Sequence, residues 1–94
     1  MMRNDAVVRA FSRGEHASAG NLWTDGRFLY SYKLKIAELR AGLVVVGDYT
    51  SGGGGYHSQT TSRHVGLAGR VADTIMLPEL FAGLSTSHQF ELPF

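Results

Sequence analysis

Hydrophobic and polar residues alternate along residues 28–36, which is the period of a β-strand with one buried face. The predicted buried positions are Phe28, Tyr30, Tyr32, Leu34 and Ile36. Ser31, Lys33 and Lys35 occupy the opposite face. We therefore expect one strand over residues 28–36 that packs one side on the core and leaves two lysines in water.

A hairpin is predicted just before this strand, where Asp25-Gly26 follows the β-prone run of residues 21–24. An Asp-Gly pair favours a type I′ turn, because both central residues of that turn need positive φ. After a break at residues 40–42, the β-branched run Leu43–Val46 predicts a central strand that ends near Tyr49. Residues 17–50 are thus expected to form a three-stranded antiparallel meander.

Helices are predicted on either side of this meander. Apolar residues recur at three- and four-residue spacing over residues 62–76, as in an amphipathic helix. The stripe consists of Val65, Ala68, Val71, Ala72, Ile75 and Met76. Pro78 ends this helix and suits the first turn of a short helix over residues 78–84. Residues 6–12 fit either a helix or a strand, since so short a run does not reveal its period.

These elements predict an α+β fold, in which an antiparallel meander of three to four strands packs against one main helix, with a short C-terminal helix. The 94 residues suffice for a single domain, residues 1–94. A domain of this size buries a modest share of its surface, so a homodimer would add useful burial. Alternating Phe90, Leu92 and Phe94 would form an edge strand or contact a second copy.

Composition narrows the class of partner. A net charge of +1 produces no strong field, so bulk charge indicates neither DNA nor an anionic membrane as partner. The chain has no cysteine, which excludes disulfides and thiolate metal sites. Its apolar runs are too short to span a bilayer, and residues 1–5 lack the apolar core of a signal peptide. We expect a cytoplasmic protein of the host cell with no membrane partner.

Four consecutive glycines, Gly52–Gly55, predict a mobile loop that leads into a helix start rich in hydroxyl side chains. Amides at a helix N-terminus attract anions, which leaves open whether this loop binds one. A phosphate-binding loop needs Lys-Ser or Lys-Thr directly after the glycines, and Tyr56-His57-Ser58 stands there instead. We therefore predict no nucleotide cradle and no other cofactor.

Histidines and serines suggest metal or nucleophile chemistry only weakly. The four histidines are His16, His57, His64 and His88. Their positions show none of the HxH, HxxxH or HExxH spacings typical of metal sites. Ser58 and Ser62 lie near histidines in sequence, but no orienting acid or nucleophile elbow accompanies them. We therefore expect no metal site and no enzyme.

An ordered set of short motifs indicates a family context. The motifs are Gly20-Asn21-Leu22, Asp25-Gly26, Leu29-Tyr30-Ser31-Tyr32 with Ile36-Ala37, and Thr60-Thr61-Ser62-Arg63-His64. Over residues 20–72 this set resembles a group of small uncharacterised bacteriophage and prophage proteins, in which a short stretch usually replaces Gly52–Gly55. The resemblance implies a phage or mobile-element context and no particular reaction. Small phage proteins without catalytic motifs are often inhibitors of host defence, such as anti-CRISPR proteins.

We therefore expect a non-enzymatic phage or prophage accessory protein that binds a host protein complex, most concretely an anti-CRISPR-type inhibitor. The candidate partner-binding residues are Lys33, Lys35, Tyr49, Tyr56, His57, Arg63 and His64. The alternative is a small nucleic-acid or nucleotide-binding protein that uses the helix start Thr61–His64 and the Lys33/Lys35 face. Nucleic-acid surfaces usually show clustered basic residues and a high pI, whereas the pI here is about 8.2.

Overall fold

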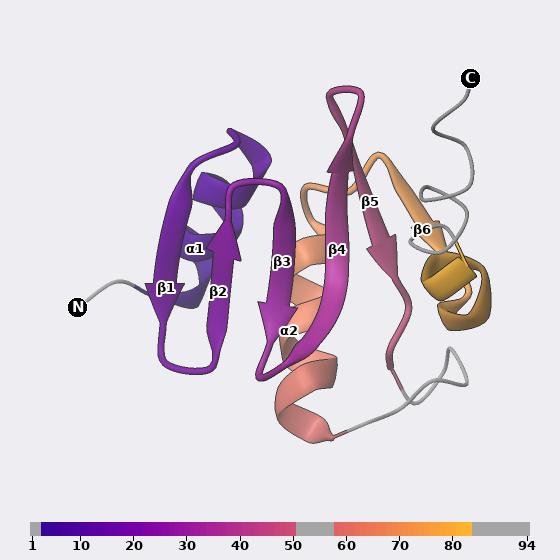
Figure 1. Ribbon diagram of the computed structural model, residues 1–94. Helices are drawn as coiled ribbons and strands as arrows, with labels where there is room; N and C mark the ends of the chain where they lie inside the picture. Colours follow the sequence, from indigo (N-terminus) through magenta and orange to yellow (C-terminus); the bar gives the residue numbers. More distant parts are fainter. Residues whose placement is uncertain (1–2, 51–57, 84–94) are drawn as a thin grey trace.

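The computed structural model describes residues 3–50 and 58–83. Within these residues, two helices cover one face of a six-stranded sheet (Figure 1). Helix α1 spans Asn4–Ser12 and helix α2 spans Gln59–Gly69. Residues 78–83 form a third, short helix. The predicted α+β class is confirmed, but the sheet has more strands than the three to four expected.

The strands follow one another across the sheet in chain order. Their bounds are His16–Ala19 for β1, Leu22–Asp25 for β2, Phe28–Ser31 for β3, Leu34–Arg40 for β4, Leu43–Gly47 for β5 and Thr74–Met76 for β6. Strands β1 to β5 form an antiparallel meander, and β6 pairs with β5 in parallel. The parallel pairing requires a crossover, which α2 supplies.

The single strand predicted over residues 28–36 is wrong, because the chain reverses at Tyr32-Lys33 between β3 and β4. Ser31 pairs with Leu34, so an odd-numbered residue and an even-numbered residue lie on the same face of the sheet. The buried positions are therefore odd-numbered in β3, although the continuous strand predicts even-numbered ones. Phe28 and Tyr30, predicted to be buried, are only half-buried, and Leu29 and Ser31 between and after them are the buried residues of β3. Tyr32, also predicted to be buried, has a φ of 59° and is 45% exposed. The sequence pattern alone contains no glycine or proline at this turn to reveal it.

Other turns agree better with the sequence. The strand ends at residues 40–42 as predicted, where the chain turns from β4 into β5. Ala41 and Gly42 have φ values of 50° and 81°, as a type I′ turn requires. The turn at Asp25-Gly26 is present, but it is not type I′, since only Gly26 has positive φ. Instead the Oδ1 atom of Asp25 accepts the N–H groups of Arg27 and Phe28, both at 2.9 Å.

The helix predicted over residues 62–76 is too long at its C-terminal end. Helix α2 ends at Gly69, and Ile75 and Met76 lie on β6. Asp73 fixes this change of direction, because its N–H donates to Val44 O at 2.8 Å and its Oδ2 accepts from Val44 N at 2.8 Å. These two bonds hold the segment after α2 against β5.

The core lies between the sheet and the two long helices. Residues 6–12, which the sequence allows as helix or strand, belong to helix α1, which buries Val7, Val8 and Phe11. Its partners in the core are Leu22, Leu29, Ile36, Ala37, Val44, Val46, Val65 and Ala68. We call the sheet side that packs on α1 and α2 the inner face and the opposite side the open face (Figure 1).

The third helix packs against the far end of the open face. A Cβ atom built on Gly47 would lie 2.7 Å from Phe81 Cδ2 and 2.7 Å from Tyr49 Cε2, so only glycine allows these rings to approach β5. Phe81 is buried. The predictions for Gly52–Gly55 and for Phe90, Leu92 and Phe94 fall outside the described residues.

Candidate functional site

The candidate partner-binding residues lie in different parts of the fold. Lys33 is exposed in the β3–β4 turn, Arg63 is exposed on α2, and Lys35 lies on β4. Tyr56 and His57 are outside the described residues. The described members of the set therefore form no single surface.

Tyr49 and His64, also in that set, are buried. The Tyr49 ring packs edge-on against Phe81 with centroids 6.2 Å apart, and burial raises the pKa of Tyr49. His64 is only 3% exposed, on the sheet side of α2. Burial removes both side chains from any docking surface that the described residues offer.

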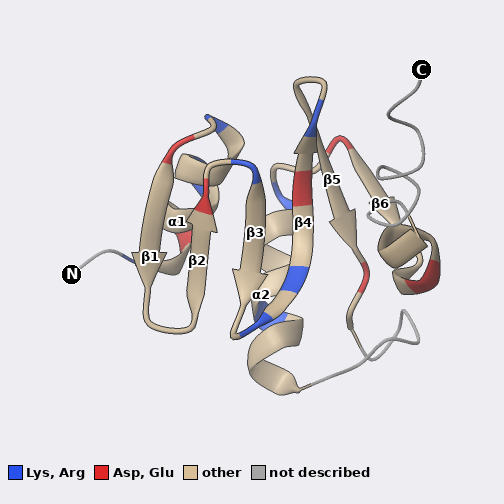
Figure 2. Ribbon diagram, viewed as in Figure 1, with Lys and Arg blue, Asp and Glu red and all other residues tan. Residues whose placement is uncertain are grey.

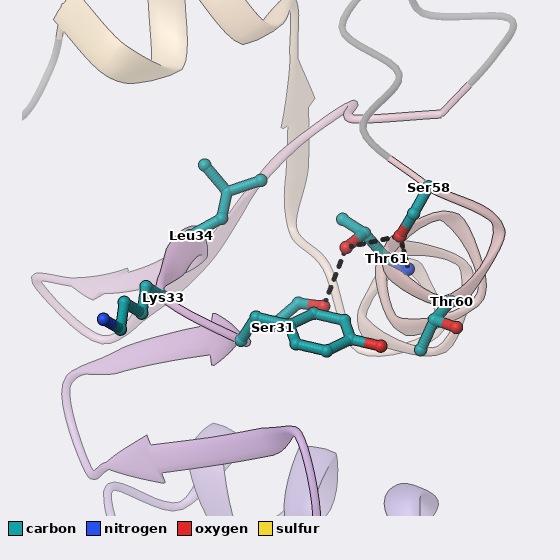
Figure 3. A pocket seen from close by; sticks show the side chains of 7 residues that line it. Ser31, Lys33, Leu34, Ser58, Thr60 and Thr61 are labelled. Atoms are coloured by element: carbon teal, nitrogen blue, oxygen red, sulfur yellow. Dashed lines mark hydrogen bonds between the residues drawn. The ribbon is translucent and has the colours of Figure 1, made fainter.

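A buried chain of hydrogen bonds joins the start of α2 to β3 (Figure 3). Ser58 caps the helix, as the hydroxyl-rich helix start predicts, since the Thr61 N–H donates to its Oγ at 3.1 Å. The Thr61 hydroxyl lies 3.0 Å from Ser31 Oγ, and Ser31 Oγ lies 2.7 Å from His64 Nδ1. Two motifs that are far apart in sequence thus meet through their buried polar side chains.

A hollow of about 580 Å³ opens beside this chain, between the β3–β4 turn and the start of α2 (Figure 3). The side chains around it include Tyr32, Lys33, Leu34 and Thr60. Ser31 also borders it but is fully buried, and its hydroxyl is engaged by Thr61 and His64. No carboxylate is among the described residues that line this hollow.

We expect the buried histidine to make the fold sensitive to acid. Burial lowers the pKa of His64, so a proton binds more readily to the unfolded chain, whose histidine titrates near pH ~6.5. This contribution to stability is complete above that pH and is lost as the pH falls from there towards the folded pKa. The variant His64→Asn, whose amide can replace Nδ1 beside Ser31, should lose less stability between about pH 7.5 and pH 5.

Urea denaturation at the two pH values measures this difference. An equal loss of stability in the wild type and in His64→Asn would contradict the assignment to His64. Comparing each protein with itself at two pH values removes any constant cost of the substitution.

The open face carries an aromatic cluster that sequence reasoning missed. The Trp23 and Tyr30 rings stack across β2 and β3 with centroids 4.1 Å apart and planes 13° apart. Trp23 is 37% exposed, and its indole N–H donates to Tyr32 O at 2.9 Å. Phe28 meets Tyr30 edge-on at 6.3 Å. In β2, Trp23 stands between Leu22 and Thr24, so the period-two alternation of a strand places it on the opposite face from both. This alternation is the sequence signal that could have revealed the surface.

Positive side chains surround these rings. The Arg27 guanidinium and the Lys35 ammonium lie 5.1 Å and 4.6 Å from the Phe28 ring centroid. Figure 2 shows basic positions at both ends of β4, with an acidic position between them. That acidic residue is Glu38, which is 1% exposed and pairs with Lys35 at 3.4 Å and Arg40 at 3.6 Å. We call Trp23, Phe28, Tyr30 and Lys35 the aromatic patch.

Neither a metal-binding cluster nor a membrane-spanning helix is found in the part of the chain that the structure describes. Residues 3–50 and 58–83 contain no group of three or more His, Asp or Glu side chains placed to hold a metal ion. Among the same residues, no helix is both long and apolar enough to cross a membrane.

Comparison with known proteins places the chain in a family without assigning it an activity. A family model described as a family of unknown function (DUF8033) matches residues 6–74. The match runs from α1 to the first residue of β6, and the chain therefore belongs to this family. No curated protein and no solved structure matches significantly.

Proposed function

We propose that this chain is a non-enzymatic binding protein that docks on a protein partner through the aromatic patch. The observation that supports this most is the stacked Trp23–Tyr30 pair, a large and partly exposed aromatic surface on a sheet face that no long helix covers. Tryptophan, tyrosine and arginine supply most of the binding energy in protein interfaces. The hydrogen bond from Trp23 to Tyr32 O already fixes the indole, so docking costs little side-chain entropy.

The partner that we propose is a host protein complex. The motif resemblance to small phage and prophage proteins supports this, and its most concrete form is an anti-CRISPR-type inhibitor in the host cytoplasm. With a net charge of +1, the chain lacks the acidity with which a protein would imitate DNA. Inhibition would therefore proceed by docking on a protein surface.

Single-stranded nucleic acid is a second candidate, favoured by the cations beside the rings. Bases bind such surfaces by stacking on ring faces. Here Trp23 and Tyr30 each use one ring face for the other, which leaves less surface for a base. The buried carboxylate of Glu38 also offsets part of the positive charge of Lys35 and Arg40.

Affinity capture with matched variants tests the docking proposal. The wild-type chain is used as bait in a bacterial lysate, beside Trp23→Ala and Tyr32→Ala. The exposed side chain of Tyr32 borders the hollow near α2, and the Tyr32 carbonyl that holds the Trp23 indole is retained in Tyr32→Ala. We expect Trp23→Ala to weaken binding of the captured complex roughly thirtyfold, as for an interface residue worth about 2 kcal/mol, and Tyr32→Ala to retain it.

Two results would contradict the proposal. Equal binding by the wild type and Trp23→Ala would remove the patch from the interface. Recovery of nucleic acid in place of a protein, lost in Trp23→Ala, would favour the second candidate. Sedimentation of the bait alone tests the predicted homodimer separately.

A further inference from the structure

Basic and acidic side chains lie close together at the end of the open face near the β4–β5 turn. Glu38 sits across from Phe28 in the β3–β4 ladder and contacts both Lys35 and Arg40. Arg27 approaches the same Phe28 ring from the end of the sheet. Lys35 and Arg40 thus share one carboxylate, whereas Arg27, whose backbone N–H donates to Asp25, approaches from the β2–β3 turn.

Two of these cations border a shared hollow. Arg27 and Arg40, with Leu39 and Ala41, line a pocket of about 430 Å³. The pocket walls are fixed, because the Leu39 N–H donates to Arg27 O at 2.7 Å and the turn at Ala41 follows directly. The pocket is therefore a preformed feature of the sheet end.

Arg40 is incompletely satisfied within the described structure. Its buried Nη1 makes no hydrogen bond, and the nearest carboxylate oxygen, Glu38 Oε2, is 3.6 Å away. Its side chain still reaches the pocket that Arg27 lines. A guanidinium presents five donors in a planar fork that matches a carboxylate, so the two arginines that line the pocket offer donors to a carboxylate although Nη1 itself is closed to solvent.

We propose that the pocket between Arg27 and Arg40 binds a carboxylate side chain on an acidic segment of the protein partner. This inference rests on the proposed function, since it assigns the chemistry of one end of the same docking surface. The aromatic patch supplies the apolar anchor, and the arginine pocket fixes where an acidic segment lies beside it. Charge complementarity of this kind sets the orientation of a partner as well as its affinity.

The test uses an N-acetylated hexaglutamate peptide as probe, followed by NMR of the arginine Nε–H signals. Titration should shift the signals of Arg27 and Arg40. The variants Arg27→Gln and Arg40→Lys should each weaken binding at least fivefold, whereas Arg70→Gln, exposed beside a different hollow near α1 and α2, should not. Arg40→Lys keeps a positive charge beside Glu38, so it tests the fork geometry without leaving the carboxylate unpaired.

Several outcomes would overturn the inference. Unshifted arginine signals, or equal weakening by Arg70→Gln, would show nonspecific attraction. Tighter binding of a deca-thymidine oligonucleotide through the same arginines would assign the pocket to phosphates. If Trp23→Ala loses the captured complex while Arg27→Gln and Arg40→Lys retain it, the pocket inference fails and the proposed function stands. If no protein is captured but the arginines still bind hexaglutamate, the proposed function fails instead.

Discussion

Replacing Gly26 with alanine should lower the free energy of unfolding by roughly 2–5 kcal/mol. Gly26 has a φ of 98°, which disfavours any residue with a Cβ. A Cβ at this position would lie 2.7 Å from the carbonyl oxygen of Gly14 and 3.2 Å from its carbonyl carbon. Both contacts are with backbone, which cannot rotate away as a side chain would. The β2–β3 turn and the end of α1 would have to separate.

Gly20→Ala is the matched control for this prediction. Gly20 also has positive φ, 64°, but a Cβ there would meet nothing within 4 Å. Gly20→Ala should therefore lower the free energy of unfolding only by the penalty for positive φ, about 1–2 kcal/mol. Urea denaturation measures both variants. Equal losses would show that the approach of Gly14 and Gly26 does not constrain the fold.

Replacing Phe11 with alanine should lower the free energy of unfolding by about 3–5 kcal/mol, because the substitution empties the centre of the core. Phe11 is fully buried on α1, where it belongs to the same cluster as Leu22 and Leu29. The small sheet cannot easily collapse around the vacated volume, since its strands are fixed by the ladder. Without this ring α1 would keep only its smaller apolar side chains on the sheet.

Trp23→Ala is the informative comparison for Phe11→Ala. The indole is exposed over more than a third of its surface, so its loss should destabilise the fold much less, while it removes the proposed docking anchor. Thermal and urea unfolding of both variants measure the difference. If Trp23→Ala destabilised the protein as much as Phe11→Ala, its effect on binding would reflect unfolding.

The sequence predicts those parts of the fold that local chemistry determines. The β-branched run of residues 43–46 forms a central strand, because such side chains fit a pleated and buried surface. The hydroxyl-rich helix start is capped by Ser58, since a serine side chain can accept an amide hydrogen that the helix leaves unpaired. The break after Arg40 follows from Gly42, which tolerates the positive φ that the turn requires.

What the sequence did not predict depends on tertiary contacts. Tyr32 adopts positive φ without being glycine, so the β3–β4 turn has no local signal and the alternation predicts one strand where there are two. The helical stripe in the sequence continues into Ile75 and Met76, whereas the bonds between Asp73 and Val44 and the pairing with β5 place these residues on a strand.

The candidate site was harder to predict than the fold. The predicted binding set consists mostly of basic, histidine and tyrosine side chains, yet His64 is enclosed beside Ser31, a contact between residues 33 positions apart. The aromatic patch forms only because β2 and β3 pair in a register that places Trp23 opposite Tyr30. Among the predicted binding residues that the structure describes, only Lys35 belongs to it, because the turn at Tyr32 carries β4 back beside β3.

The most direct test of the central claim is an NMR footprint of the captured partner on the isotope-labelled chain. If the aromatic patch is the docking surface, the indole N–H of Trp23 and the amides of β2, β3 and β4 should shift or broaden. The signals of α1 and of the exposed side of α2 should then stay unchanged. A footprint centred on α2 or on the β3–β4 turn, with the Trp23 indole unaffected, would contradict the account.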